Sequence, residues 1–466
     1  MNHLLCIDIG TSYLKAAIVT RDGAILEKGR APLSLFESDG YTCIEPAEWL
    51  PALRKICLGF KSLGGIAALS VTGNGPSLIA VSRGQLALKP ALSWMDRSCA
   101  SEARTIGELA GKPYDPSFYL AKALRLARVF GLDEIWRFFS GPEYLAFILG
   151  AEPASYLPSE GYEPFIWNSP FHEALGLPAS LFPPYAGPGT VIGHTKQTAT
   201  GLPAGIPIIA SYPDFLAAIA GTSCIEPGRI CDRTGSSETL NACSSGYDDT
   251  DRLLRLPHLV PDYWNLSGGV STSGKAIDWF CSLQGSDYAL ENFIEDSTRA
   301  AFDSGLLFLP YLHGERAPLW NPKLRAMFLG LEARHTRRDL ARAVLEGVIF
   351  GLRYTHDTMM RLNQPRFPLR TSGYLADIPA INQLKADILR TAVENGIHAE
   401  GELLGCAAAC LLGLGEARSI AAACGSIFVP YNRYEPGPDD RYEEKYQAFL
   451  AALSFATKAT ERGVSA

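Results

Sequence analysis

Apolar and polar positions alternate along the first half of the chain in short blocks. Short, almost wholly apolar runs are typical of buried strands, and they occur at residues 4–9, 16–19, 66–71 and 206–210. A helix with apolar residues at helical spacing is predicted to open at Pro46 and to run through Ile56. Buried strands that alternate with helices predict an α/β domain.

The second half has periodic elements of its own. The clearest prediction is a helix over residues 337–362 with Thr336 as its N-cap, and further helices are expected over 379–395 and 402–412. Residues 114–149 are predicted to be largely helical and residues 150–188 irregular. The pattern breaks near residues 224–228, which indicates a domain boundary there.

Composition narrows the class of protein. The chain has 466 residues, 47% of them apolar, which suits two or three globular domains. Its 42 basic and 49 acidic residues give a net charge of −7, which argues against a nucleic-acid partner. No apolar run reaches the ~18 residues of a membrane span. The eleven cysteines follow no disulfide or metal spacing, and the N-terminus has no signal-type segment, so we expect a cytoplasmic protein.

The first candidate site is the hairpin that opens the chain. Asp8 ends an apolar strand and could hold a metal ion or its waters, and Lys15 adds a positive charge on the following strand. Between them, Gly10, Thr11 and Ser12 can direct backbone N–H groups and two hydroxyls at a phosphate. An ordinary hairpin with a polar turn would have the same pattern.

A second carboxylate, Asp214, follows the apolar run at 206–210. Open α/β sheets bind ligands at the carboxyl ends of their strands, where an aspartate could accept the proton of an attacking hydroxyl. The alternative is that Asp214 only caps the helix that begins at Phe215.

Two further glycine-containing segments could face phosphates. The turn Gly235–Ser236–Ser237 is similar in chemistry to the first turn, although it could be a plain turn. Residues 269–275 resemble a P-loop, but Ala276 occupies the place of the Mg²⁺-binding hydroxyl and no preceding strand is evident. We therefore interpret residues 269–275 as a coincidental match.

Residues suited to a sugar lie between the first two candidate sites. Trp94 offers an apolar platform, with the carboxylate of Asp96 and the guanidinium of Arg97 beside it. These three could equally be a half-buried Trp beside a surface ion pair. Asn74 and Gly75 could bring backbone close to a small polar ligand, or form a simple turn.

The order of these motifs resembles the FGGY family of carbohydrate kinases, within the actin/hexokinase-type ATPases, over nearly the whole chain. Its most specific part is residues 308–318, followed by 342–347 and by residues 402–408, which resemble the family's Glu-x-x-x-Gly-Ala-Ala helix. The resemblance implies an α/β fold of two actin-like (ribonuclease H-like) domains flanking a deep catalytic cleft. Residues 1–224 would form the sugar-binding domain and residues 225–466 the nucleotide-binding domain.

The resemblance also implies roles for individual residues. Asp214 would be the general base, with Asp8 holding Mg²⁺ and Lys15 assisting at the γ-phosphoryl group. Two sets of residues would contact the ligands. ATP would be bound by Gly10, Thr11, Ser12, Gly235, Ser236, Ser237, Gly373 and Gln383, and the sugar by Asn74, Gly75, Trp94, Asp96 and Asp214.

The chain departs from the family pattern at several positions. Ser236 and Glu238 replace a Thr and a Gly of the second phosphate turn, and Tyr374 stands where nucleotide normally meets backbone. We expect an ATP-dependent kinase of a ketopentose such as xylulose, or of a related ketose or polyol. A catalytically degenerate binding protein of the same fold stays open as the alternative, as does an assembly or chaperone ATPase on this fold. A homodimer is also possible.

Overall fold

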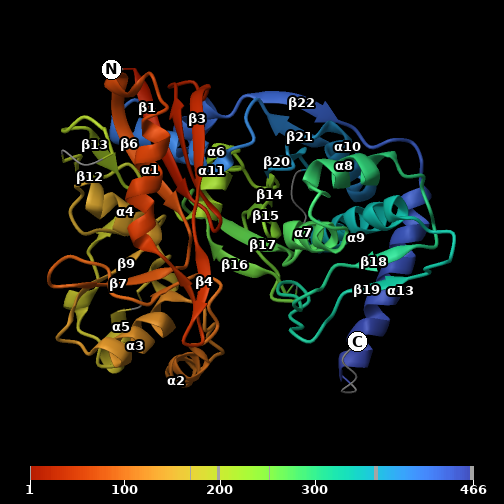
Figure 1. Cartoon of the computed structure of the whole chain (residues 1–466), viewed down its shortest axis with the longest axis horizontal. Coiled ribbons are helices and arrows are strands. Elements are labelled where there is room, and N and C mark those ends of the chain that lie inside the picture. Colours follow the sequence, from red (N-terminus) through yellow and green to blue (C-terminus); the bar gives the residue numbers. More distant parts are fainter. Residues whose placement is uncertain (1, 168, 197–199, 251, 362–365, 462–466) are drawn as a thin grey trace. The chain divides into compact units, whose positions relative to one another are not determined.

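The computed structural model describes residues 2–167, 169–196, 200–250, 252–361 and 366–461. The chain separates into two compact units. The first contains residues 1–223, 257–261 and 401–428, and the second contains residues 224–256, 262–400 and 429–466. Both units combine a mixed sheet with helices, which confirms the predicted α/β class and two-domain organisation (Figure 1).

The first unit is built on a six-stranded sheet. In spatial order its strands are β12 (Val191–His194), β13 (Pro207–Ile209), β6 (Ile66–Gly73), β1 (His3–Ile9), β2 (Tyr13–Val19) and β3 (Ile25–Pro32). The central strands β13, β6 and β1 are parallel, while β2, β3 and β12 run antiparallel to their neighbours. The four apolar runs predicted as strands therefore all belong to this one sheet.

Successive side chains of β1 point to opposite faces of the sheet. Leu5, Ile7 and Ile9 belong to a core shared with α1 (Trp49–Cys57) and α4 (Gly141–Leu149). On the other face, the Cys406 thiol of α11 (Gly401–Gly413) lies 3.7 Å from the Ile7 carbonyl oxygen and close to Cys6. Asp8 follows the same alternation as Cys6, so it shares the α11 face of β1.

Helix α11 joins the first unit through close contact with α6 (Asp214–Gly221). A Cβ on Gly221 would lie 2.0 Å from the Gly401 carbonyl oxygen, and one on Gly405 would lie 2.0 Å from that of Ala217. Only glycine allows backbones to approach this closely. Residues 401–428, which the sequence analysis assigns to the second domain, consequently pack with the first unit.

A five-stranded sheet completes the first unit. Its strands, in spatial order, are β4 (Leu35–Ser38), β5 (Tyr41–Ile44), β8 (Ala91–Leu92), β7 (Leu78–Ser82) and β9 (Ile135–Ser140). The prediction that residues 114–149 are largely helical is wrong at β9, which separates α3 (Tyr119–Phe130) from α4. Phe138 and Phe139 are fully buried in β9, and strands favour such aromatic runs.

Between α4 and β12 the described residues form short elements joined by loops, which agrees with the irregular structure predicted for residues 150–188. They are β10 (Ser155–Tyr156), α5 (Ser169–Ala174) and β11 (Tyr185–Ala186), and α2 (Ala100–Ala110) and α12 (Ile420–Ile427) are the other helices of this unit.

The second unit has a seven-stranded sheet. Its strands, in spatial order, are β16 (Leu254–Pro257), β17 (Trp264–Val270), β15 (Glu238–Ser244), β14 (Ile230–Thr234), β20 (Leu369–Gly373), β21 (Val393–Gly396) and β22 (Pro430–Tyr434). From β17 to β22 the pairing senses repeat those from β3 to β12 in the first unit. The hairpin β14–β15 thus corresponds to the hairpin β1–β2, which no sequence repeat revealed.

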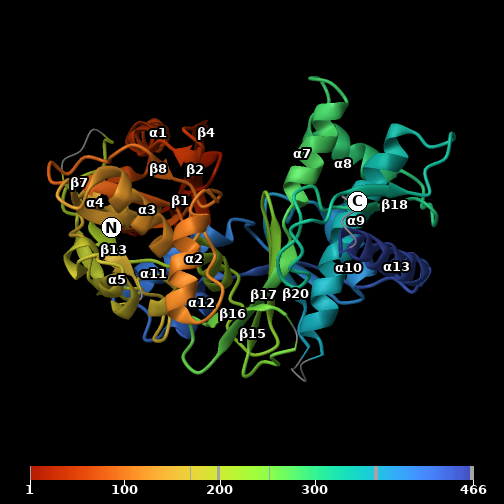
Figure 2. The same cartoon turned by 90° about the horizontal axis from the view of Figure 1, so that it is seen from below.

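Helices cover this second sheet. They are α7 (Ser273–Leu283), α8 (Leu290–Arg299), α9 (Arg337–Met359), α10 (Pro379–Leu389) and α13 (Arg441–Glu461), and β18 (Leu307–Leu309) pairs with β19 (Met327–Leu329) beside them. Figure 2 shows α9, α10 and α13 lying together. Within the described residues, no helix is both long and apolar enough to cross a membrane.

The predicted helix starts agree with the structure better than the predicted ends. The backbone N–H and the hydroxyl of Thr336 both donate to Asp339 at 2.7 Å, which caps α9 at the predicted residue. Helix α9 ends at Met359, and Leu362, the predicted end, lies outside the described residues. Helix α10 ends at Leu389 rather than 395, because residues 393–396 form β21.

Candidate active site

Three of the sequence motifs meet at one edge of the first sheet. Strands β1, β6 and β13 are adjacent and parallel, so their carboxyl ends share an edge. The Gly10 turn follows β1, Asn74 and Gly75 follow β6, and Asp214 follows β13. This is the place where open α/β sheets bind their ligands.

The first turn holds a carboxylate and an ammonium together. Asp8 is 3% exposed and pairs in register with Lys15 on β2, whose Nζ lies 3.3 Å from Asp8 Oδ2. The Gly10 N–H donates to the Tyr13 carbonyl at 2.9 Å and closes the turn. Because the Lys15 side chain is 42% exposed, its charge remains accessible to a ligand.

The predicted sugar loop is tied to this turn. The indole N–H of Trp94 donates to Thr11 Oγ1 at 2.9 Å, and the Trp94 backbone N–H donates to Ser77 Oγ, also at 2.9 Å. Ser77 in turn donates to Asn74 Oδ1 at 2.7 Å. One hydrogen-bonded chain therefore joins the loops that follow β1 and β6 to the Trp94 loop.

The Asp96 carboxylate is held by its own loop. Oδ2 accepts from the Thr42 N–H at 2.8 Å, and Oδ1 accepts from the N–H and hydroxyl of Ser98 at 3.1 and 2.6 Å. Arg97 forms an exposed ion pair with Asp115 at 2.5 Å. These bonds order the loop, and a contact of Asp96 with a sugar stays a prediction.

Lys122 joins two of the predicted sugar-binding loops and was not predicted from the sequence. Its side chain is fully buried, and Nζ donates at 2.7 Å to the carbonyls of Pro76 and Ser93. Pro76 belongs to the loop after β6 and Ser93 to the Trp94 loop, and we call these two loops, which are predicted to bind the sugar, the acceptor loops. Burial lowers the pKa of Lys122 to about 7, while the Asp96 carboxylate opposes that shift. The signal was available, because Lys122 is a charged residue inside the apolar run of α3.

Asp214 lies at the start of α6 among tyrosines and backbone. Its Oδ1 accepts from the Phe215 N–H at 2.8 Å, and a Cβ on Gly75 would lie 3.8 Å from Oδ1 and 3.6 Å from the Tyr119 hydroxyl. Burial raises the pKa of Tyr119 and of Tyr162, and the charge of Asp214 adds to both shifts. Asp214 and Gly75, which are far apart in sequence, are thus brought together.

The second turn is closed in the same way as the first. The Gly235 N–H donates to the Ser237 carbonyl at 2.8 Å, and the Ser236 carbonyl accepts from the Lys275 N–H at 3.1 Å. Glu238 is 1% exposed, and its carboxylate accepts from Lys385, Thr234 and Ser273.

The other predicted nucleotide residues belong to the loop after β20 and to α10. Gly373 has a φ of 98°, and a Cβ there would lie 2.0 Å from the Thr234 carbonyl oxygen, so this position requires glycine. The Gln383 amide donates to Asp387 at 2.9 Å and to the Glu435 carbonyl at 2.8 Å. These bonds hold α10 to the segment after β22, and a nucleotide contact of Gln383 stays a prediction.

The P-loop-like segment needs one correction. A strand does precede it, since β17 covers Trp264–Val270 and leads through a short turn into α7. The argument from a missing strand was therefore wrong. The argument from Ala276 stands, because this residue is fully buried and carries no hydroxyl.

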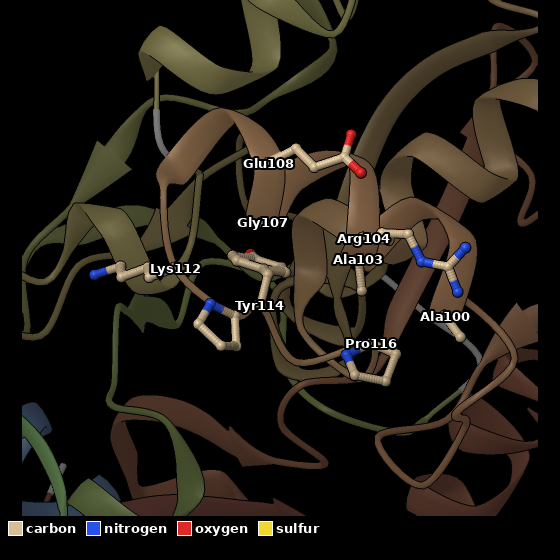
Figure 3. Close-up of a pocket in the computed structure, with 9 residues that line it drawn as sticks. Ala100, Ala103, Arg104, Gly107, Glu108, Lys112, Tyr114 and Pro116 are labelled. Atoms are coloured by element: carbon tan, nitrogen blue, oxygen red, sulfur yellow. The ribbon is translucent and has the colours of Figure 1, made fainter.

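A surface pocket of about 440 Å³ lies elsewhere in the first unit, on α2 and the loop after it (Figure 3). Its lining is composed of Ala100, Ala103, Arg104, Gly107, Glu108, Lys112, Pro113, Tyr114 and Pro116. This lining includes none of the predicted site residues.

Comparison with known proteins identifies the family. Residues 3–120 match the N-terminal domain of the FGGY family of carbohydrate kinases, and residues 216–414 match its C-terminal domain. The chain belongs to the FGGY family. It is accordingly an ATP-dependent carbohydrate kinase.

Relatives of this FGGY kinase cover nearly its full length. It is 27% identical to a xylulose kinase of Staphylococcus epidermidis, over 96% of each chain, and 26% identical to a gluconokinase of Bacillus subtilis, over 95% of this chain and 93% of that one. The crystal structure of a xylulose kinase from Lactobacillus acidophilus superposes with a TM-score of 0.83 at 20% identity, covering 98% of this chain and 99% of that one. These relatives agree on the family but differ in the acceptor named for them, so they do not identify the acceptor of this chain.

Proposed function

We propose that this FGGY kinase transfers the γ-phosphoryl group of ATP to a hydroxyl of an uncharged ketopentose such as xylulose, with Asp214 as general base. The observation that carries the proposal is the shared edge of β1, β6 and β13, where the Asp8 turn, Gly75 and Asp214 meet.

The base role rests on the surroundings of Asp214. Gly75 has no side chain to fill the space beside Oδ1, so a small ligand can approach the carboxylate there. A carboxylate within hydrogen-bond reach of the acceptor hydroxyl orients it and takes its proton as the oxygen attacks phosphorus. The Tyr119 hydroxyl borders the same space, and the charge of Asp214 helps to raise the pKa of Tyr119 and of the buried Tyr162.

The phosphate role rests on the two turns. The Gly10–Ser12 turn offers two hydroxyls beside the Asp8–Lys15 pair, and Lys15 would offset charge on the transferring phosphoryl group. We assign the Gly235–Ser237 turn and the loop at Gly373 to the nucleotide in the second unit. Asp8 and the two hydroxyls suit a hydrated Mg²⁺, which binds through one or two carboxylates and keeps several waters. Such an ion would neutralise phosphate charge.

Charge at the acceptor loops favours a neutral sugar over gluconate. An acid substrate needs a cation for its carboxylate, and the cations described on these loops are already engaged. Lys122 donates to two backbone carbonyls, and Arg97 pairs with Asp115. This argument, with the similarity to xylulose kinases, supports the ketopentose.

The degenerate alternative is less favoured. The sequence raised it because Glu238 could place negative charge beside phosphates. Glu238 instead accepts from Lys385, Thr234 and Ser273, so its charge is compensated within the protein.

Asp214→Asn separates a base from a purely structural residue. The N-cap of α6 is Pro213 rather than Asp214, and an asparagine keeps the bond from the Phe215 N–H but cannot take a proton at neutral pH. We expect kcat on xylulose to fall by roughly 10²–10⁴, the usual contribution of a general base. Thermal stability and ATP affinity should stay close to wild type. Retained turnover in a folded Asp214→Asn enzyme would mean that Asp214 is only a structural residue.

A two-substrate comparison tests the acceptor class. The kcat/KM for D-xylulose is expected to exceed that for D-gluconate by at least roughly tenfold, since an uncompensated carboxylate would lose a charged hydrogen bond. Equal or reversed values would reject the neutral-sugar proposal and leave the kinase family assignment intact.

A further inference from the structure

A buried charge cluster lies directly behind the Gly235–Ser237 turn. Lys385 of α10 is 1% exposed, and its Nζ lies 2.5 Å from Asp232 Oδ2 and 2.5 Å from Glu238 Oε1. Asp232 belongs to β14 and Glu238 opens β15, so the two carboxylates stand on the two strands that the turn joins. We call Lys385, Asp232 and Glu238 the lysine cluster.

Hydrogen bonding distinguishes the two carboxyl groups. Glu238 accepts from Thr234 at 3.0 Å and from Ser273 at 2.6 Å in addition to Lys385. Burial opposes its ionisation, but the Lys385 ammonium and these hydrogen bonds lower the pKa of Glu238. For Asp232, burial dominates and raises the pKa, and its Oδ1 has no hydrogen-bond partner. Burial thus favours a proton on Asp232, whereas Glu238 is held as a carboxylate by Lys385, and this distribution leaves the lysine cluster without net charge.

The lysine cluster also contacts the start of α7, which packs on the Gly235–Ser237 turn. Ser273, which donates to Glu238, is the first residue of α7 and is fully buried. A Cβ on Gly274 would lie 2.4 Å from the Gly235 carbonyl oxygen, and the Lys275 N–H donates to the Ser236 carbonyl at 3.1 Å. The first turn of α7 thus packs directly on the backbone of the Gly235–Ser237 turn.

We propose that the lysine cluster positions the Gly235–Ser237 turn for the phosphates of the nucleotide, with Lys385 as the positioning residue. The inference rests on the proposed role of this turn. Lys385 acts through Glu238, which fixes the end of the turn, and through Ser273, which fixes α7 against it. Without the ammonium, Glu238 would be a buried unpaired charge and would pull away from Ser273 toward water.

The test compares two buried Lys–Glu pairs of the same unit. Lys445 Nζ lies 2.5 Å from Glu346 Oε2, with side chains 2% and 1% exposed, and its other partner is the Asp303 carbonyl. Each pair also has a second ionisable partner, Asp232 for Lys385 and Arg342 for Glu346. Glu238→Gln/Lys385→Met and Glu346→Gln/Lys445→Met therefore remove the same charges at matched burial, and each leaves one other ionisable group behind. The readouts are kcat, the KM for ATP, the KM for the acceptor and the melting temperature.

Both double variants are expected to melt earlier, but only the first should change nucleotide use. Its KM for ATP should rise about tenfold, as expected for a charged hydrogen bond that orients a binding group. Its acceptor KM should stay within about twofold, as should both KM values of the Lys445 variant. Equal KM values for ATP in the two variants would overturn the proposal and leave a purely structural pair.

Two further variants keep the test decisive. Glu238→Gln alone preserves shape, so it should raise the KM for ATP even if the double variant fails to fold. Ser236→Glu puts a negative charge on the turn itself. If Ser236→Glu leaves the KM for ATP unchanged, the turn is not a phosphate site and the proposed function fails there. If Ser236→Glu raises that KM and the lysine-cluster variants do not, only the positioning proposal fails.

Discussion

The two hairpin turns of this kinase have the same strand pairing, but the lysine beside each turn differs in its exposure to solvent. In the first unit Asp8 lies one residue before the last pair of its hairpin, beside Thr72 of the next parallel strand, and in the second unit Asp232 lies two residues before the last pair, beside Thr371. Asp8 pairs with Lys15, a half-exposed residue of its own hairpin. Asp232 pairs with Lys385, which is fully buried and comes from a distant helix.

This difference in burial suggests that the two hairpins, although paired alike, have different roles. In the first pair only the ammonium of Lys15 is half-exposed, so it can exchange the buried Asp8 carboxylate for a phosphate. A fully buried lysine cluster, in which Glu238 accepts further hydrogen bonds, fixes the surrounding backbone and is out of reach of a ligand. We therefore infer that the first turn takes part in phosphoryl transfer, whereas the second is held in a fixed conformation and binds the nucleotide.

The largest expected effect that separates the turns is on stability. Lys385→Met removes the cation of a buried cluster, and we expect the free energy of unfolding to drop by about 3–5 kcal/mol. Lys15→Met removes an ammonium that is 42% exposed, but it takes one partner from the buried carboxylate of Asp8, so we expect a smaller loss of about 1–2 kcal/mol. Urea unfolding of both variants measures the two values. Equal losses would contradict the distinction between the half-exposed and the fully buried lysine.

The pH dependence of stability sharpens the comparison. Burial raises the pKa of Asp232 to about 8, against the pull of Lys385, while Glu238 adds a repulsive charge. The folded chain then keeps a proton that the unfolded chain releases, so the stability contributed by this group falls as pH rises from about 4 to about 8. Unfolding free energies at pH 5 and pH 8.5 should show wild type losing stability relative to Asp232→Asn. A constant difference would mean that Asp232 is ionised throughout.

The smallest effect is expected from the tie between Trp94 and Thr11. Trp94→Phe keeps the ring but removes one neutral hydrogen bond, which costs about 1 kcal/mol, or about fivefold in kcat/KM for the acceptor. The corresponding change at the second turn, Ser273→Ala, should act on the KM for ATP instead. Steady-state kinetics with each substrate varied in turn distinguishes these two outcomes.

Local patterns were enough to predict the first turn. The strands around it are short apolar runs, and Asp8 and Lys15 flank a turn of fixed length, so cross-strand pairing follows. Asp214 and Gly75 were each identified from the end of an apolar strand. Their closeness follows from the parallel order of β13, β6 and β1, which no single run of residues encodes.

The lysine cluster could not be predicted in this way. Lys385 and Glu238 are 147 positions apart, and only the packing of α10 behind β14 and β15 brings them together. The one local signal was a lysine between Leu384 and Ala386 in an apolar helix. The placement of α11 in the first unit is non-local for the same reason, because it depends on close backbone contact at Gly221 and Gly405.

The most direct test of the contrast between the two turns is the same Asp→Asn substitution made before each turn, on β1 and on β14. In Asp8→Asn the kcat on xylulose with ATP and Mg²⁺ is expected to fall about a hundredfold or more, the scale of a misplaced reacting group. In Asp232→Asn, which replaces a protonated carboxyl by an amide of the same shape, kcat at pH 7 should remain within about twofold of wild type. Similar losses in the two variants would contradict the assignment of chemistry to the first turn and positioning to the second.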